Sequence, residues 1–185
     1  MHTAPGDQPL VQLPRWAVVS EKRRAHTVRV VTLLHIWAEA LKIDAHERQC
    51  WVDAGAWHDS LRDAEEPLLR ALTGDSARPW GLLHGPASAL RLEAEGETRT
   101  SVLEAIRWHT VGQAVWGRTG RALYMADFLE PGRSFMQADR AFLAARVPES
   151  FDAVFRQVVR MRLERAIREG NGLEVETVTL WNAVC

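Results

Sequence analysis

Apolar residues recur at spacings of three and four along most of this chain, and this periodicity constrains its fold more than any other feature. Between residues 20 and 43, for example, Val30, Leu33 and Trp37 fall on one helical face. Strand-like alternation is scarce, and Gly and Pro residues separate the periodic segments. The pattern therefore predicts one all-α domain built from helices of moderate length.

Capping and helix-breaking residues set the expected helix limits. Ser20 and Asp44 stand where N-caps are needed, and Glu47 has the capping-box spacing from Asp44. Glycines and prolines close the segments. The helices are expected at residues 20–43, 44–58, 67–72, 86–92, 98–110, 121–129, 151–168 and 177–183.

Composition excludes several classes of protein. Lys plus Arg is 23 and Asp plus Glu is 24, so the net charge of −1 gives no basic footprint for nucleic acid. Two cysteines, Cys50 and Cys185, make no disulfide framework, and no apolar run is long enough to span a membrane. We therefore expect a cytoplasmic protein, with residues 1–19 as a loosely ordered lead-in that is not a signal peptide and residues 20–185 as the domain.

Four of the seven histidines stand out by their position. His26 shares the apolar face of its helix, whereas His35 lies nine residues further on, about 180° around the helix. His46 lies in a first helical turn and His2 in the N-terminal tail, so these three histidines are set aside. The candidates that border apolar runs are His26, His58, His84 and His109.

Two aspartates complete the candidate set. Asp59 follows an apolar segment and Asp127 lies inside another, where a carboxylate is costly to bury unless it is paired or bound to a metal. Taken singly, Asp127 could instead form a salt bridge to an arginine, His84 could be a loop or capping residue, and His109 could be a cation at a helix C-terminus.

Metal ligation explains all six residues together. Imidazole and carboxylate ligands suit iron, zinc, manganese or nickel, and a pair of such metals activates water against a phosphate. The residues therefore predict a metal-dependent phosphohydrolase if the six side chains converge.

Several longer motifs surround these six residues, and together they resemble the YqeK family of the HD-domain phosphohydrolase superfamily. The resemblance extends over roughly residues 20–183, and an HD-domain helical bundle is the fold it implies. The motifs are RxxHT at 23–27, HD at 58–59, LHGP at 83–86, AIRWHTVG at 105–112, YMADFLEPGR at 124–133 and the stretch 177–182.

The resemblance implies a symmetrical diadenosine tetraphosphate hydrolase that releases two ADP at a di-iron site. One metal would be held by His26, His58, Asp59 and Asp127, and the other by Asp59, His84 and His109. Asp59 would then bridge two metals that share a hydroxide nucleophile. The expected cofactors are two divalent ions, iron first, with manganese, nickel and cobalt as alternatives.

Other positions are expected to touch the substrate, a small nucleotide. Asp59 and Arg62 are the candidate catalytic residues, and Trp116 is a candidate for stacking on adenine. The candidate substrate contacts are Arg23, Arg62, Thr110, Gly112 and Arg133.

Two departures from the family pattern bear on the choice of substrate. The family commonly has Lys at the position of Arg62, and Asp-Lys at Gly120-Arg121. An arginine cannot readily donate a proton to a leaving group. A mononucleotide-cleaving nucleotidase or phosphomonoesterase, and a non-catalytic nucleotide-binding regulatory domain, therefore remain as alternatives. For the oligomeric state, a homodimer is one option.

Overall fold

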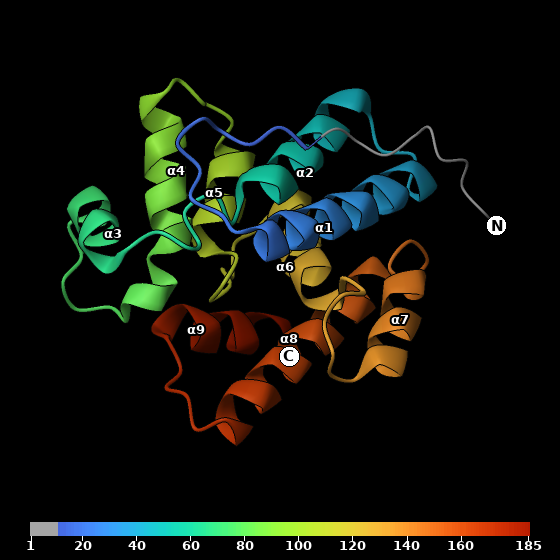
Figure 1. Ribbon diagram of the computed structural model, residues 1–185. Coiled ribbons are helices and arrows are strands. Elements are labelled where there is room, and N and C mark those ends of the chain that lie inside the picture. Colours follow the sequence, from blue (N-terminus) through green and yellow to red (C-terminus); the bar gives the residue numbers. More distant parts are fainter. Residues whose placement is uncertain (1–10) are drawn as a thin grey trace.

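The computed structural model describes residues 11–185, so the first ten residues of the expected lead-in lie outside it. Across the described residues the chain forms nine α-helices and one 3-10 turn, without a strand, which confirms the prediction of an all-α fold. The helices, labelled in Figure 1, are α1 (Glu21–Ala40), α2 (Ala45–Trp57), α3 (Glu66–Thr73), η1 (Trp80–Leu82), α4 (His84–Ala94), α5 (Thr100–Trp108), α6 (Arg118–Leu129), α7 (Gln137–Arg146), α8 (Phe151–Arg168) and α9 (Val175–Val184).

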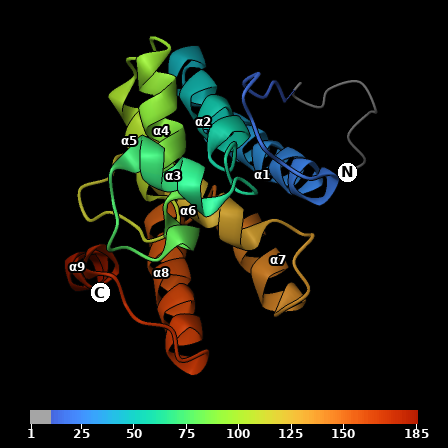
Figure 2. The same ribbon diagram turned by 60° about the vertical axis from the view of Figure 1, so that its left-hand side comes forward.

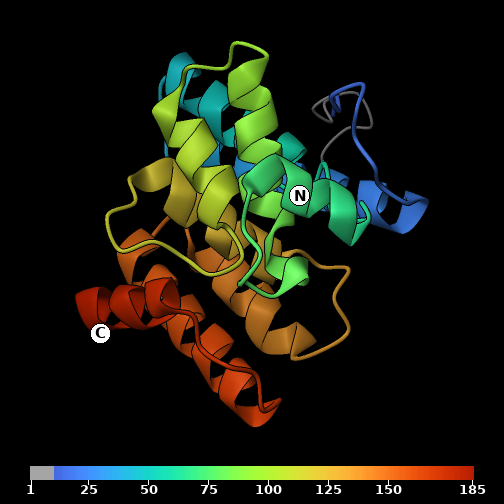
Figure 3. The same ribbon diagram turned by 90° about the vertical axis from the view of Figure 1, so that its left-hand side faces the viewer.

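Helix α6 is the centre of the packing. It contacts α1, α2 and α5 on one side and α7 and α8 on the other. Every residue from Ala122 to Leu129 is buried, as expected for a helix surrounded by others. Helices α4 and α5 lie side by side (Figure 2), and α9 lies beside α8 (Figure 3). A carboxylate on α6, such as that of Asp127, is therefore held inside the core.

The predicted N-caps fix where the first two helices begin. The Ser20 hydroxyl accepts a hydrogen bond from the Arg23 backbone N–H at 3.4 Å, and Asp44 accepts one from the Glu47 N–H at 2.9 Å. Helix α2 ends at Trp57, so that His58 becomes its C-cap and the next residues turn.

The observed limits of the predicted helices lie within three residues of the expected ones. Helix α8 has the predicted limits, whereas α4 begins two residues early and takes in His84. Helix α7 was not predicted. Its N-cap is Met136, in a left-handed conformation without a side-chain cap, and the only residue it buries fully is Arg140. It therefore lacks both the capping signal and the apolar stripe by which helices are recognised in a sequence.

Residues 11–19 run along the helical body. The Val18 N–H donates to the Ser60 carbonyl at 2.7 Å, and the Trp57 indole N–H donates to the Gln12 carbonyl at 3.0 Å. Cys50 is buried, Cys185 is exposed, and both are free thiols. No helix within residues 11–185 has the length and apolar character needed to cross a membrane.

Candidate metal centre

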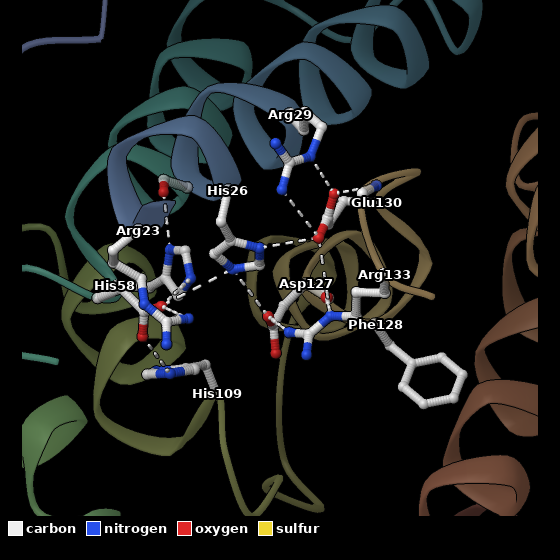
Figure 4. A network of polar contacts seen from close by, with 12 residues as sticks. Arg23, His26, Arg29, His58, His109, Asp127, Phe128, Glu130 and Arg133 are labelled. Atoms are coloured by element: carbon white, nitrogen blue, oxygen red, sulfur yellow. Dashed lines mark hydrogen bonds and ion pairs between the residues drawn. The ribbon is translucent and has the colours of Figure 1, made fainter. Parts of the chain in front are cut away.

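The six predicted ligands come together at one buried place. They are supplied by α1, by the end of α2, by the start of α4, by the end of α5 and by α6. Figure 4 labels His26, His58, His109 and Asp127 among them. His35, which was set aside, lies elsewhere on α1 beside Glu39, and His46 is exposed. The helix-face argument that separated these histidines therefore agrees with their positions in the structure.

Asp59 lies between two pairs of histidines. Its Oδ2 atom is 3.5 Å from His58 Nε2 and 3.7 Å from His26 Nε2. Its Oδ1 atom is 3.2 Å from His84 Nε2 and 3.5 Å from His109 Nε2. Each carboxylate oxygen thus faces a different pair of imidazoles, which is the geometry needed by a carboxylate that bridges two cations.

Asp127 extends the cluster on the side of His26. Its Oδ1 atom is 3.2 Å from His26 Nε2. His26, His58 and Asp127 can bring one ligand atom each within 4.8 Å of the others, and His58, Asp59 and His109 can do the same. Groups of this size and composition suit divalent transition metals.

Backbone carbonyls orient three of the four imidazoles. In each case Nδ1 donates a hydrogen bond to the carbonyl oxygen three residues earlier, an assignment that follows from the hydrogen-bond network. This fixes the proton on Nδ1 and leaves Nε2 as a lone pair that faces the cluster. The pairs are His58 with Gly55 at 2.8 Å, His84 with Gly81 at 2.9 Å and His109 with Ile106 at 2.7 Å.

The lone pairs of these imidazoles suit a cation. His84 Nε2 and His109 Nε2 are 3.0 Å apart, and with both Nδ1 atoms protonated neither Nε2 has a hydrogen to share. The Nε2 atoms of His26 and His58 are buried and lack a hydrogen-bond partner among the described residues. Buried polar atoms are almost always satisfied, so the donor set fits metal ions.

The electrostatics give Asp59 and His109 the protonation states that a metal needs. Burial alone would raise the pKa of Asp59, but the imidazoles around it, His58 first and then His109 and His84, hold it well below its usual value. Burial lowers the pKa of His109 to about 4. His109 is therefore neutral at pH 7, which excludes its role as a cation at the end of α5 and suits ligation.

Glu130 supports His26 from behind. Its Oε1 atom is 3.1 Å from His26 Nδ1, and its Oε2 atom accepts hydrogen bonds from Arg29 and from the Gly132 backbone N–H. Burial would lower the pKa of His26, yet the neighbouring carboxylates of Asp127 and Glu130 raise it to about 9. Carboxylates commonly hold metal-binding imidazoles in this way. Glu130 was not predicted as a site residue, although a buried acid three residues after Asp127 was a usable signal.

Arginines surround the two aspartates. Arg23 donates to Asp59 Oδ2 at 2.9 Å, Arg133 to Asp127 Oδ1 at 2.5 Å, and Arg162 to Asp127 Oδ2 at 3.3 Å. Asp127 thus forms the salt bridges that were the alternative expectation for it, and it also lies against His26. Arg162 was not predicted, because α8 carries several arginines and nothing in the sequence tells which of them faces inward.

A cavity of about 630 Å³ opens beside the cluster, a volume typical of small-molecule sites. Its lining includes Asp59, His84, His109, Asp127, Thr110 and four arginines: Arg23, Arg62, Arg133 and Arg162. The rest of its lining includes residues 171–174 and 177, together with Pro79, Gly81, Leu82 and Val111. Of the predicted substrate contacts, four line this cavity and Gly112 does not.

Three other positions have roles in packing. Gly112 has φ +91°, and a Cβ there would meet the Leu180 side chain. Trp116 is only 5% exposed and donates its indole N–H to the Glu104 carbonyl at 3.2 Å, so the prediction that it stacks on adenine is wrong. Gly120 lies against the Trp116 ring, which leaves no room for a side chain.

The fold has a known relative among solved structures. It matches the crystal structure of a predicted HD superfamily hydrolase involved in NAD metabolism from Clostridium acetobutylicum with a TM-score of 0.76 and 24% identity, over 90% of both chains. The chain therefore has the HD-hydrolase fold, as predicted.

Proteins with similar sequences indicate which group of HD hydrolases this chain is related to. The chain is 31% identical over 127 residues to the symmetrical bis(5'-nucleosyl)-tetraphosphatase of Staphylococcus aureus, which covers 64% of each protein. It is 27% identical over 129 residues to the Bacillus subtilis protein of the same name, covering 65% of this chain and 68% of that one. No protein-family model matches. The chain is thus a homologue of these symmetrical tetraphosphatases, which confirms the resemblance seen in its motifs.

Proposed function

We propose that this protein is a metal-dependent phosphohydrolase that cleaves dinucleoside polyphosphates symmetrically, with diadenosine tetraphosphate giving two ADP. The observation that carries the proposal is the placement of Asp59 between two histidine pairs, at the wall of an arginine-lined cavity. The names of its sequence relatives support the choice of substrate.

The proposed cofactors are two divalent metal ions, iron first, with manganese, nickel or cobalt as alternatives. When bound, such a pair acidifies water and neutralises charge on the attacked phosphate. One ion would be held by His26, His58, Asp59 and Asp127, and the other by Asp59, His84 and His109. The distances of Asp59 from the four imidazoles support its place in both groups.

The arginines would bind the polyphosphate. Arg62 lines the cavity and forms no ion pair with any residue of the described part, so its guanidinium is available to a phosphate. An arginine binds two phosphate oxygens at once but keeps its proton. Arg62 would therefore neutralise negative charge on the phosphate, and the proton needed by the leaving group would come from water. Arg23 and Arg133 flank the same region, and the Thr110 hydroxyl lies 3.2 Å from His109 Nε2 at its edge.

The products of hydrolysis test this proposal. Purified protein loaded with iron or manganese is expected to convert diadenosine tetraphosphate to ADP alone, as measured by chromatography of the nucleotides. The His35→Gln variant, altered on α1 outside the cluster, should behave like the wild type. Formation of AMP and ATP would contradict the symmetrical cut. Release of inorganic phosphate from mononucleotides would favour a nucleotidase, and nucleotide binding without turnover would favour a regulatory domain.

Glu130→Gln tests the support of the metal centre. The amide cannot keep the negative charge beside His26 and Arg29, so we expect metal affinity or turnover to fall by about 10- to 100-fold while the fold is retained. Metal titration and initial rates measure the effect. Glu39→Gln, the same change at an exposed position, is the control. Unchanged affinity and rate in Glu130→Gln would mean that this carboxylate does not tune the site.

A further inference from the structure

Arg140 is the most deeply buried arginine in the described part of the chain, with an exposed fraction of 1%. It lies on α7, does not line the cavity and is not among the predicted site residues. Within residues 11–185 no carboxylate forms an ion pair with it. Burying a cation without an acidic partner costs free energy. The groups that contact Arg140 should therefore show which role offsets this cost.

The guanidinium of Arg140 is bound entirely by backbone carbonyls. Nε donates to the Phe128 carbonyl at 2.8 Å, and Nη1 donates to the carbonyls of Arg133 at 2.9 Å and Phe135 at 3.1 Å. Nη2 donates to the Glu130 carbonyl. One side chain thus binds the last turn of α6 and the turn that follows it, where the carbonyls have no partners within a helix.

The segment that Arg140 holds, residues 130–135, carries two side chains to the metal centre (Figure 4). Glu130 lies against His26, and Arg133 donates to both the backbone carbonyl and the carboxylate of Asp127. The path of this segment is tight, since the Gly132 N–H donates to Glu130 and a Cβ at Gly132 would meet the Arg29 guanidinium. A shift of this backbone would therefore move both side chains.

We propose that Arg140 is a positioning residue, which fixes residues 130–135 so that Arg133 meets the substrate phosphate and Glu130 meets His26. The proposal rests on the proposed function for the role of Arg133. It follows from the planar fork of the guanidinium, whose five N–H donors reach four carbonyls at once. The single ammonium of a lysine has only three donors at one atom and cannot span them.

A double-mutant cycle tests the proposal. Arg140→Met, which keeps the apolar volume, should lower kcat/KM for diadenosine tetraphosphate by about 100-fold, because small misplacements of a positioned group have effects of this size. Combined with Arg133→Ala, it should add little to the effect of Arg133→Ala alone. Arg23 lies on the opposite side of the cluster. In the double variant with Arg23→Ala, the fold-loss in kcat/KM should therefore equal the product of the losses of the two single variants. If the losses of Arg140→Met and Arg133→Ala also multiply in their double variant, the proposal is overturned. A general loss of stability would give the same multiplication with Arg133→Ala as with Arg23→Ala.

Hydrogen exchange gives a second readout that needs no substrate. The amide of Gly132 should exchange at least about 10-fold faster in Arg140→Met and in Arg140→Lys than in wild type, because its bond to Glu130 is held by this backbone. Arg140→Lys keeps the charge and serves in the cycle if Arg140→Met does not fold. Unchanged exchange at Gly132 in Arg140→Lys would overturn the proposal. Faster exchange in a protein whose wild type does not cleave the dinucleotide would contradict the proposed function alone.

Discussion

The Asp59→Asn variant is expected to lose its hydrolytic activity by about 1,000-fold or more and to bind fewer metal ions. Both carboxylate oxygens of Asp59 face histidine pairs, so the replacement removes one ligand atom from each side of the proposed centre. The amide is neutral, and its NH₂ group is a donor that cannot bind a metal. Loss of a supporting group alone costs about 10- to 100-fold, and a shared ligand should cost more.

Metal content and turnover should be measured on the same preparations of the Asp59→Asn variant. Elemental analysis is expected to find about two ions per chain in the wild type and less than about one in the variant. Asp152→Asn, the same change at a side chain that is 70% exposed, is the matched control and should retain both properties. A variant of Asp59 with full metal content and full activity would exclude the bridging role.

The metal-ligand candidates could be selected from the sequence because helical periodicity is a local property. His26 shares a face with apolar residues and His35 does not, and this difference can be worked out from residue numbers alone. Asp127 stood out for a similar reason, since an acid inside an apolar run must be paired or bound. The sequence could not show how the helices cross, so the approach of Asp59 to four imidazoles required the structure.

The supporting residues could not be selected in the same way, because their roles depend on contacts between distant segments. Glu130 meets His26 across 104 positions of the chain, and Arg162 meets Asp127 from α8. Arg140 acts through backbone carbonyls, which no residue pattern records. Helix α7 was missed together with Arg140, since it has neither a side-chain cap nor a buried apolar stripe.

Arg62 and Gly120, the two positions that depart from the family pattern, have different surroundings in the structure. Arg62 lines the cavity beside the cluster, so we expect the presence of arginine, where the resemblance implies lysine, to affect substrate binding. Gly120 instead lies against the Trp116 ring, where a side chain would clash with the indole. The absence of a carboxylate at Gly120 is therefore explained by packing, and we expect Arg62 to be the departure that alters substrate preference.

Removal of the metals is expected to lower the melting temperature by about 5–15 °C at pH 7. A ligand that binds only the folded state stabilises it by about 3–4 kcal/mol at 100 to 1,000 times its Kd. In a domain of this length each kcal/mol shifts the melting temperature by about 2–4 °C. The effect should be large here because metal-free His84 and His109 direct unshared lone pairs at each other.

The size of this shift should also depend on pH. In the metal-free protein the pKa of His26 is raised to about 9 by Asp127 and Glu130, despite its burial, so a metal must displace a proton from it at pH 7. The stability that this proton gives the metal-free protein is complete below the ordinary value of about 6.5 and is lost as the pH rises through about 9. Both effects widen the difference in melting temperature between metal-loaded and chelator-treated protein from pH 7 toward pH 9.

Scanning calorimetry with and without a chelator measures this gap in melting temperature, and His35→Gln should show the same gap as the wild type. Asp59→Asn should show a smaller gap, and a gap of wild-type size in that variant would contradict the assignment of the stabilising ions to this cluster.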